Sequence, residues 1–595
     1  MLFAIIFPLL VSAQKKDAFS LKVELADRDS TFLIDEEIKF QTIHNSAASV
    51  EKELQKLKMQ LTYRSYMTAS VDSLVNDSLD YVAYIDVGES FKWAELRRGN
   101  AEENILDKIG FREQFYQKKP FYYQEVGKLI ESIQEYCENN GFPFATVGLD
   151  SVQISADNRI SAQLNVRKNN FITFKEIKLV GDDVKISKRY LQNYLGIQPD
   201  EPYSLKKIKD IPRLIRELPF LKETKSPILS FRGSEATVNL FLAKKKASKF
   251  DFLVGVLPRN ESTGNRLLIT IDGMFSTQNL LGAGEKFFVE FRQVQAGTQR
   301  MDLEVSWPYI IDLFGAEADF SLYKRDSTYL DIEYDVGISY SFSARHSLTA
   351  FWHNRNTFLL EVDKDRIRQT KKLPENLDTR FTDFGLRHHI EDLDYRFNPR
   401  KGWSITTRAS AGFKSIQTNN EIKNLLDPLD PTFDFASLYD DLDARSIQYQ
   451  IGVDAWGFLP FYPKQRGVLA IHNQTGGLLS PNPVFLNEQF RIGGSKILRG
   501  FDEESVPTSL YSIFSLEYRF IIGRNSYIYL FGDYGFSQSN SPSGKTNDTP
   551  LGFGAGFTFE TGAGIFGISG AYGKQFNNPI DFRAAKIHFG YLSYF

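Results

Sequence analysis

The sequence is poor in cysteine, in net charge and in long apolar runs. Its 595 residues include one cysteine, Cys137, which excludes an internal disulfide. The formal net charge of −3 at pH 7 excludes a protein that binds nucleic acid through bulk positive charge. Beyond the N-terminal segment, no apolar run reaches the roughly 18 residues that a transmembrane helix needs. These absences leave two interpretations: a soluble all-β protein, or a membrane β-barrel. The strands of such a barrel alternate apolar and polar residues and are therefore not detected as long hydrophobic runs.

Motifs for enzyme chemistry are also missing. Neither Gly-x-Ser-x-Gly nor His-Glu-x-x-His occurs in the chain. Ser543-Gly-Lys-Thr546 resembles the end of a phosphate-binding loop, but Ser539 stands where the first glycine is required. His388 and His389 are adjacent, so on a strand they face opposite sides and cannot chelate together. The sequence therefore predicts no enzyme, with no catalytic residue, metal site or cofactor.

Aromatic residues are abundant, with 28 Tyr and 50 Phe. Membrane β-barrels carry aromatic belts at both membrane interfaces, and this excess favours the barrel over the soluble protein. The chain begins with an apolar segment, Met1–Ala13, that ends in Val11-Ser12-Ala13 without the usual basic start. We interpret residues 1–13 as a secretory signal peptide. Since no cysteine follows the cleavage site, a lipoprotein is not expected.

Between residues 18 and 246, an amphipathic helix followed by two strands occurs three times. In the first repeat, apolar residues at spacings of four, three and four mark one helical face: Val50, Leu54, Leu57 and Leu61. The pattern predicts three α+β modules, at residues 18–89, 90–169 and 170–246. Cys137 shares the apolar face of the second helix, which favours a packing role, with a reactive thiol as the alternative.

The order and spacing of these elements resemble the POTRA domain, the periplasmic module of outer-membrane assembly and secretion proteins. Such a module offers a sheet edge to which an extended client strand can be added through main-chain hydrogen bonds. Modules that act only as spacers are the alternative.

From residue 247 to the end, the hydrophobic period changes to two. Sixteen segments begin near Phe250, Leu267, Glu285, Arg300, Ala316, Leu330, His346, Arg380, Gly402, Arg445, Gly467, Leu510, Ser526, Leu551, Ala563 and Ala584. An even number of about 16 antiparallel strands is typical of a single-chain outer-membrane barrel. The sequence thus predicts α+β modules followed by an all-β transmembrane barrel at residues 247–595.

The lengths of the connections indicate the orientation of the barrel. Long polar connections follow the seventh, ninth, eleventh and thirteenth strands: Asn356–Asp378, Ser415–Ala444, Gly477–Thr508 and Ser537–Pro550. The connections of even number are mostly shorter. Because outer-membrane barrels have short periplasmic turns and long outer loops, this parity predicts that the modules lie in the periplasm.

The last strand ends on an aromatic residue, and Phe589, Tyr591 and Phe595 share one face as lipid-facing residues would. We expect this strand to pair with the strand near Phe250, which would close the barrel. As a hypothesis, Gly590 weakens that seam.

The segment Leu498-Arg-Gly-Phe501 looks like the signature of the POTRA-bearing barrel family that includes BamA and TamA. The segments Ser515–Phe520 and Leu530–Gly535 resemble the family's next two strands. Two further segments, Asn279–Gly284 and Asp394–Gly402, resemble an early barrel segment and a later turn of the family. Leu498 is a mild departure from the commoner Val or Ile.

The resemblance implies that Arg499, followed by Gly500 and Phe501, reaches into the lumen and pairs with Glu517 and Asp533. An arginine keeps its charge, and its planar fork accepts bidentate pairing with carboxylates. The loop glycines Gly493, Gly494 and Gly500 would let the backbone pass close to the barrel wall. An exposed loop with incidental charges is the alternative.

By this resemblance, we expect an outer-membrane insertion or assembly factor without enzymatic activity. Its partners would be unfolded outer-membrane or secreted clients and the lipid bilayer. Periplasmic or lipoprotein accessory subunits are further candidate partners. A pore of the two-partner-secretion type, which passes a polypeptide through its lumen, is the alternative. A plain porin would leave the three modules unexplained.

Overall fold

The computed structural model describes most of the chain. It covers residues 18–29, 31–181, 184–245, 247–257, 268–295, 297–395, 398–440, 442–443, 445–461, 466–494, 497–501, 504–561, 564–576, 578–580 and 585–592. The predicted signal peptide, residues 1–13, and Phe595 lie outside this set. None of the helices in these ranges is both long and apolar enough to cross a membrane.

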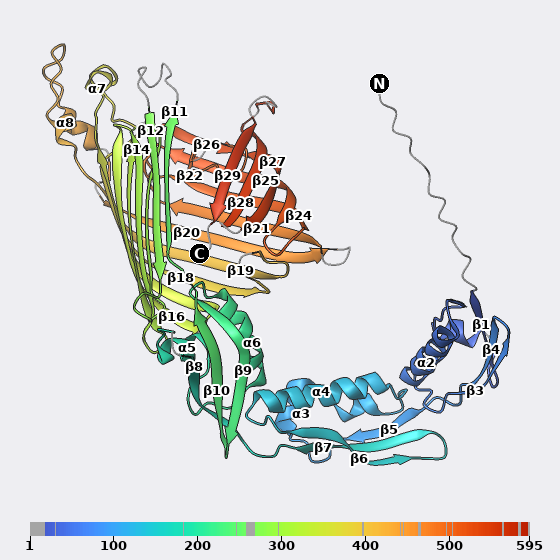
Figure 1. Cartoon of the computed structure of the whole chain (residues 1–595). Helices are drawn as coiled ribbons and strands as arrows, with labels where there is room; N and C mark the ends of the chain where they lie inside the picture. Colours follow the sequence, from blue (N-terminus) through green and yellow to red (C-terminus); the bar gives the residue numbers. More distant parts are fainter. Residues whose placement is uncertain are drawn as a thin grey trace, which may run out of the picture. The chain divides into compact units, whose positions relative to one another are not determined.

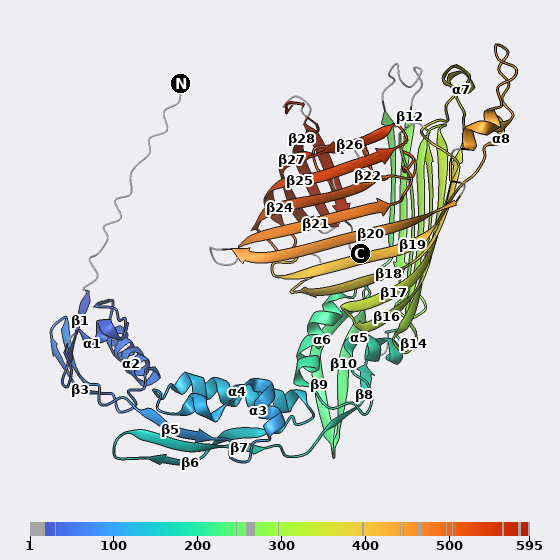
Figure 2. The same ribbon diagram turned by 180° about the vertical axis from the view of Figure 1, so that it is seen from behind.

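The chain divides into two compact units. The first comprises Met1–Phe174, Asp200–Lys206 and Phe231–Ala236. The second comprises Lys175–Pro199, Lys207–Ser230 and Thr237–Phe595. Figures 1 and 2 show helices packed on small sheets in the N-terminal part of the chain and one large curved sheet in the C-terminal part.

The first module folds around a single long helix. Its elements are β1 (Phe19–Leu25), α1 (Phe32–Asp35), β2 (Ile43–His44), α2 (Ala47–Tyr63), β3 (Ser70–Asp77) and β4 (Asp80–Asp86), with the sheet order β2-β1-β4-β3. The hydroxyl of Ser46 caps α2 by accepting the Ser49 N–H at 3.2 Å. The four apolar residues that marked this helix in the sequence are all buried against the sheet. The helix therefore packs through the face that the periodicity predicted.

The second module follows the same plan. Its elements are β5 (Lys92–Arg97), α3 (Glu103–Ile109), the 3₁₀ helix η1 (Glu113–Tyr116), α4 (Tyr123–Asn139), β6 (Thr146–Ile154) and β7 (Arg159–Arg167), with the sheet order β5-β7-β6. Cys137 lies on α4 within the core of this module and is 1% exposed. Burial raises the pKa of the Cys137 thiol. Both observations place this cysteine in a packing role.

The third module contains β8 (Thr173–Val180), α5 (Lys188–Leu195), α6 (Leu205–Glu217), β9 (Leu221–Arg232) and β10 (Glu235–Lys244), in the order β8-β10-β9. In each module the first strand of the C-terminal hairpin (β3, β6 or β9) lies at one edge of the sheet. Such an edge keeps main-chain donors and acceptors free for another strand.

Within the described residues, seventeen strands form the large sheet, and every pairing between them is antiparallel. They are β11 (Lys249–Leu257), β12 (Leu268–Gln278), β13 (Lys286–Gln295), β14 (Thr298–Ile311), β15 (Phe314–Arg325), β16 (Tyr329–Ser343), β17 (His346–Leu359), β18 (Thr379–Leu393), β19 (Gly402–Ile416), β20 (Arg445–Phe461), β21 (Gly467–Leu479), β24 (Leu510–Ile521), β25 (Tyr527–Ser541), β26 (Gly544–Asp548), β27 (Leu551–Thr561), β28 (Gly564–Lys574) and β29 (Lys586–Leu592). Apart from the short β26, the sixteen remaining strands each begin within two residues of a predicted start. The prediction of about sixteen antiparallel strands is thus confirmed.

The four long connections contain more regular structure than the sequence indicated. They hold α7 (Lys364–Thr370), α8 (Asn420–Lys423), the 3₁₀ helix η3 (Phe435–Tyr439) and the hairpin of β22 (Phe490–Ile492) and β23 (Val506–Thr508). The prediction of a polar loop over Ser537–Pro550 was wrong for most of its length. There β25 continues to Ser541 and pairs with β26, because main-chain hydrogen bonds form whatever the polarity of the side chains.

The predicted pairing of the first and last strands is absent from the described part of the chain. There β11 pairs with β12 alone and β29 with β28 alone, so the sheet is unclosed. Gly590 and Tyr591 lie on β29 opposite Gly567 and Phe566 of β28. With 9 and 7 residues, β11 and β29 are shorter than most of the strands between them and offer few main-chain bonds for closure.

Because Cys137 is buried and the pKa of its thiol is raised, less reactive thiolate is present at pH 8 than for a free cysteine. We expect iodoacetamide to modify the folded chain at least about tenfold more slowly than the chain unfolded in urea. Mass spectrometry of timed samples measures both rates. Equal rates in the two states would show that this thiol is accessible.

Candidate functional site

The buried face of β24 is polar and its exposed face is apolar, the reverse of a soluble sheet. Ser515, Glu517 and Arg519 are buried, whereas Phe514 and Leu516 are 49% and 47% exposed. This alternation is typical of a strand with one face toward lipid and the other toward a polar interior. We call the buried face the inner face.

Residues 480–509, the inward segment, connect β21 to β24, and the residues of this segment that the structure describes pack against the inner face. Ile492 and Leu498 are fully buried, and Phe501 and Val506 are nearly so. They form a small core with Tyr511 and Ile513 of β24. Because these apolar side chains gain burial only against the sheet, the segment folds inward rather than outward.

Arg499 is the main polar anchor of the inward segment. Its Nη2 lies 2.6 Å from Asp533 Oδ1 and its Nε 2.9 Å from Asp533 Oδ2, a bidentate pair. Its Nη1 lies 2.8 Å from Glu517 Oε2, and its main-chain N–H donates to Asp533 at 2.9 Å. The guanidinium also lies 3.6 Å from the centre of the Phe531 ring. The structure thus brings together the three charged residues of the family signature.

The glycines of the inward segment lie at positions that other residues would disturb. Gly493, Gly494 and Gly500 have φ angles of 114°, 101° and 91°. A Cβ atom on Gly500 would lie 2.4 Å from the carbonyl carbon of Tyr572 on β28. Gly552 on β27 is equally tight, since its Cβ would lie 2.0 Å from the carbonyl oxygen of Arg499. The backbone at Arg499 and Gly500 therefore touches the sheet directly.

A second arginine supports the anchor. Arg519 Nε lies 2.7 Å from Glu517 Oε1, so Glu517 accepts from two guanidinium groups. The Arg519 guanidinium also lies 5.3 Å and 4.9 Å from the ring centres of Phe458 and Tyr527. Sequence reasoning missed this residue, although its position two residues from Glu517 places both on one face of β24.

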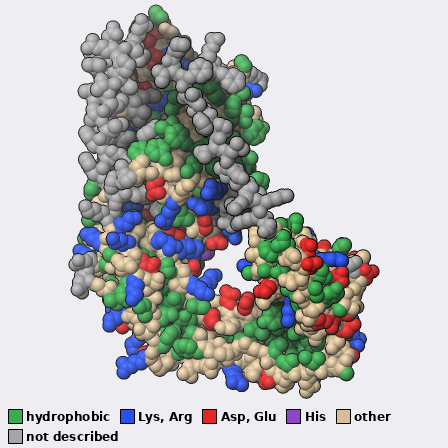
Figure 3. Space-filling model, turned by 45° about the vertical axis from the view of Figure 1, so that its right-hand side comes forward, with side chains coloured by type: hydrophobic (Ala, Val, Ile, Leu, Met, Phe, Trp, Pro, Cys, Tyr) green, Lys and Arg blue, Asp and Glu red, His purple; other side chains and the backbone are tan. Residues whose placement is uncertain are grey.

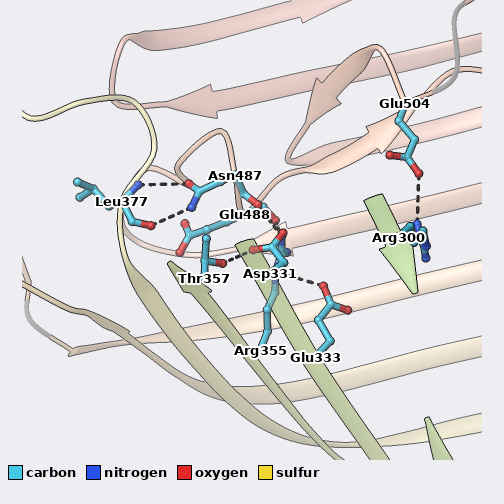
Figure 4. Close-up of polar contacts among 9 residues, drawn as sticks. All are labelled: Arg300, Asp331, Glu333, Arg355, Thr357, Leu377, Asn487, Glu488 and Glu504. Carbon is cyan, nitrogen blue, oxygen red and sulfur yellow. Dashed lines mark hydrogen bonds and ion pairs between the residues drawn. The ribbon is translucent and has the colours of Figure 1, made fainter. Parts of the chain in front are cut away.

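The inward segment has a second anchor on the inner face, at strands β16, β17 and β19 (Figure 4). Arg355 of β17 donates to the main-chain carbonyls of Asn487 at 2.5 Å and Glu488 at 3.1 Å, and its Nη2 lies 2.7 Å from Asp331 Oδ2. Lys414 of β19 pairs with Glu488 at 2.6 Å, and both side chains are over 90% buried. This anchor joins residues 132 and 133 positions apart, and no local pattern marks it.

Three further contacts fasten the same segment to β14–β16 and to the connection between β17 and β18. Asn487 exchanges hydrogen bonds with the main chain of Leu377, and Glu504 lies 3.2 Å from Arg300 of β14. Arg491, which had no predicted partner, lies over the rings of Tyr323 and Tyr329 at 4.9 Å and 5.1 Å. The segment is thus held between β14–β19 on one side and β24–β28 on the other.

A cavity of about 440 Å³ adjoins the inward segment. Its titratable lining comprises Asp319, Glu333, Asp335, His353, Arg355, Arg408 and Glu488. In the part of the chain that the structure describes, no three His, Cys, Asp or Glu side chains form a group suited to a metal ion. Figure 3 shows basic and acidic side chains intermingled in a band at mid-height of the larger unit.

The predicted residues of the last strand are described through their main chain alone. Gly590 and Tyr591 lie on β29, whose one partner among the described strands is β28. Phe595 lies outside the described residues.

A family model described as the Omp85 superfamily domain matches residues 279–591, which include Arg499, Glu517 and Asp533. Similar solved structures include BamA from Haemophilus ducreyi lacking POTRA domains 1–3, with 14% identity, TM-score 0.43 and coverage of 84% of this chain and 98% of that chain. They also include CdiB from Escherichia coli, with 13% identity, TM-score 0.48 and coverage of 91% and 97%. CdiB from Acinetobacter baumannii has 13% identity, TM-score 0.47 and coverage of 89% and 94%. No curated protein matches the chain.

Substitution of Arg499 by alanine leaves the fully buried Asp533 without its charged partner. Breaking a buried pair in this way costs about 3–5 kcal/mol, so we expect a clear loss of heat resistance and of function. Arg499→Lys keeps one charge but cannot bond both carboxylates, so its effect should be intermediate.

The temperature at which the folded band converts to the unfolded band in gel electrophoresis measures this loss. Arg366→Ala is a matched control, because Arg366 is exposed on α7. The anchor would be refuted if Arg499→Ala were as heat-resistant and active as the control.

Within the second anchor, the ion pair of Lys414 and Glu488 should show energetic coupling between its two charges. Lys414→Met leaves the buried Glu488 carboxylate unpaired and should cost about 3 kcal/mol. Lys414→Met combined with Glu488→Gln removes both charges and should cost less than the single change. The same gel conversion tests this order. A double variant that loses the sum of the two single effects would contradict the pairing.

Proposed function

The chain belongs to the Omp85 superfamily, and on that premise we propose that it is an outer-membrane factor that inserts client polypeptides at the edge of its own sheet. The modules would lie in the periplasm and receive unfolded clients. We propose that the protein acts without enzymatic chemistry and without a cofactor. Family membership supports a role in outer-membrane insertion or translocation, and the choice of insertion rests on the inward segment.

The observation that carries this choice is the double anchorage of the inward segment. A polypeptide that crossed the lumen would have to displace a segment held by Arg499 on one side and by Arg355 and Lys414 on the other. Each anchor contains buried charges, which are costly to separate. A route along the edge strands requires neither anchor to break. This difference in cost favours insertion at the edge.

The edge strands offer main-chain hydrogen-bonding groups with which a client strand could pair. Among the described strands, β11 and β29 each pair on one side alone, which leaves main-chain groups on the other side to template an added strand. The module edges β3, β6 and β9 offer the same chemistry earlier in the path. We propose that clients engage these edges first and the large sheet afterwards, with accessory subunits able to use the same edges.

Tethering of the inward segment separates insertion from translocation. Ser539 on β25 donates to the Gln489 side chain at 2.8 Å, so cysteines at both positions should accept a short cleavable cross-linker. The full-length chain with Gln489→Cys, Ser539→Cys and Cys137→Ala is assayed in proteoliposomes with a labelled unfolded barrel client. We expect client insertion to remain within about twofold after cross-linking, because the edge route leaves the segment in place.

The single variants, treated with the same reagent, control for modification alone. If cross-linking abolishes client transport and reduction restores it, the polypeptide passes through the lumen, and the translocation pore replaces insertion.

Depletion of the protein in its own cells gives an independent test. We expect several outer-membrane barrel proteins to decline together, because one insertion factor serves many clients. Quantitative proteomics of the outer-membrane fraction measures this, with inner-membrane proteins as the control. Loss of a single secreted protein, with barrel proteins unchanged, would contradict the proposal.

A further inference from the structure

Two histidine rings from neighbouring strands meet on the outer face of the large sheet. His346 is the first residue of β17, and His388 lies on β18 opposite Leu348, two residues further along β17. The Nε2 atoms of the two rings are 2.9 Å apart. Sequence reasoning considered His388 with its neighbour His389, which faces the other side of the strand, and missed the partner on β17.

Both rings belong to the face of the sheet that carries exposed apolar side chains. On β17 this face includes Trp352, which is 36% exposed, and on β18 it includes Phe384, which is 68% exposed. His389, on the opposite face, forms a hydrogen bond with Thr406 at 2.9 Å. The pair of His346 and His388 therefore lies outside the interior that the inward segment occupies, and a ligand can reach it without displacing that segment.

The pair lies at the rim of the sheet where the third module is bound. Arg345, in the turn before His346, forms a buried ion pair with Glu217 of the third module. The Phe342 ring, which packs on Tyr340 at 4.9 Å, stacks on the His346 ring at 4.4 Å. Such a row of rings at the end of membrane-facing strands marks the level of the lipid headgroups, where water and dissolved ions are present.

The surroundings of the pair are uncharged. Both imidazoles are half-buried, and within the described residues their mutual contact is the one hydrogen bond that either ring forms. Ile390 lies opposite His346, and Thr407 lies opposite His388. No cationic side chain that contacts the rings in this part of the chain therefore opposes the approach of a metal ion.

The separation of the two nitrogens suits a metal ion that binds its ligands at right angles. An imidazole nitrogen lies about 2.0–2.1 Å from a bound Zn²⁺ ion. At that bond length two nitrogens are about 2.9 Å apart for an angle of about 90°, but about 3.3 Å apart for the tetrahedral angle. Angles near 90° are typical of Cu²⁺ and Ni²⁺, and Cu²⁺ binds nitrogen ligands more tightly. The two strands pair without a bulge from His346 to Thr357, which fixes the spacing of the rings before an ion arrives.

We propose that His346 and His388 bind one Cu²⁺ ion through their Nε2 atoms, with water molecules in its remaining positions. Binding replaces the hydrogen bond between the rings. The donor ring gives up its Nε2 proton and carries a proton on Nδ1 instead, so that the charge of the ring does not change. The ion would join β17 to β18 beside the turn that binds the third module. This site does not rest on the proposed function, which needs no metal.

Copper titration of the full-length, untagged chain tests the site. The protein is freed of metal with EDTA and transferred to neutral detergent micelles. Calorimetry with glycine as a competing chelator gives the stoichiometry and the affinity. Electron paramagnetic resonance without glycine counts the nitrogen nuclei bound to the copper. The variants are His346→Gln, His388→Gln and, as the matched control on the opposite face of the same strand, His389→Gln, after gel mobility confirms that each is folded.

We expect the wild type to bind one Cu²⁺ ion with hyperfine splitting from two nitrogen nuclei. His346→Gln and His388→Gln should each lose one nitrogen and bind at least about 100-fold more weakly, because the second ring acts at a high effective concentration once the first is bound. The control should bind within about twofold of the wild type. Either outer-face variant is sufficient, so if one does not fold the other decides the result.

Splitting from one nitrogen or from none in the wild type would overturn the inference. Unchanged binding by the outer-face variants would overturn it as well, because the copper would then lie elsewhere on the chain, and so would an equal loss of affinity in His388→Gln and His389→Gln. Displacement of Cu²⁺ by an equal concentration of Zn²⁺ would show that the assignment of the metal is wrong.

Discussion

The inner face of the large sheet is organised by the need to neutralise buried charge. Asp533 is fully buried, and it is compensated by Arg499, which arrives on a connection rather than on a neighbouring strand. An unpaired carboxylate at this depth would be strongly destabilising, so the connection is constrained to remain inside. Glu517 and Arg519 are neutralised in the same way, because each charge in the group has a partner of opposite charge within 3 Å. The conformation of the inward segment follows from this constraint.

The inward segment is bound to the sheet at two distant places. Arg355 and Lys414 bind its first half, and Arg499 binds its second half. The segment therefore links distant strands of a sheet whose edge strands have no mutual pairing among the described residues. An anchored interior combined with edge strands that pair on one side alone is the physical basis of our proposal that clients are inserted at the edge.

Much of the fold was predictable because its signals are local. Apolar and polar residues alternate along each strand, and the spacing of Val50, Leu54 and Leu57 marks a helix. Both patterns can be recognised wherever the neighbouring elements lie. The pairing of Arg499 was accessible through its resemblance to a family signature. By contrast, the extension of β25 through Ser537–Ser541 was missed, because its polar side chains conceal a regular pattern of main-chain hydrogen bonds.

The sequence by itself determined the sixteen strands and the modular N-terminal part, and its resemblance to a family signature identified Glu517 and Asp533 as the partners of Arg499. Only the tertiary structure decided that Arg355 meets Asn487, that Arg491 lies over two tyrosine rings and that Glu504 meets Arg300. These partners lie more than 100 residues apart along the chain. Their contact depends on how the sheet curves and where the inward segment crosses it, and neither property is encoded in the spacing of neighbouring residues.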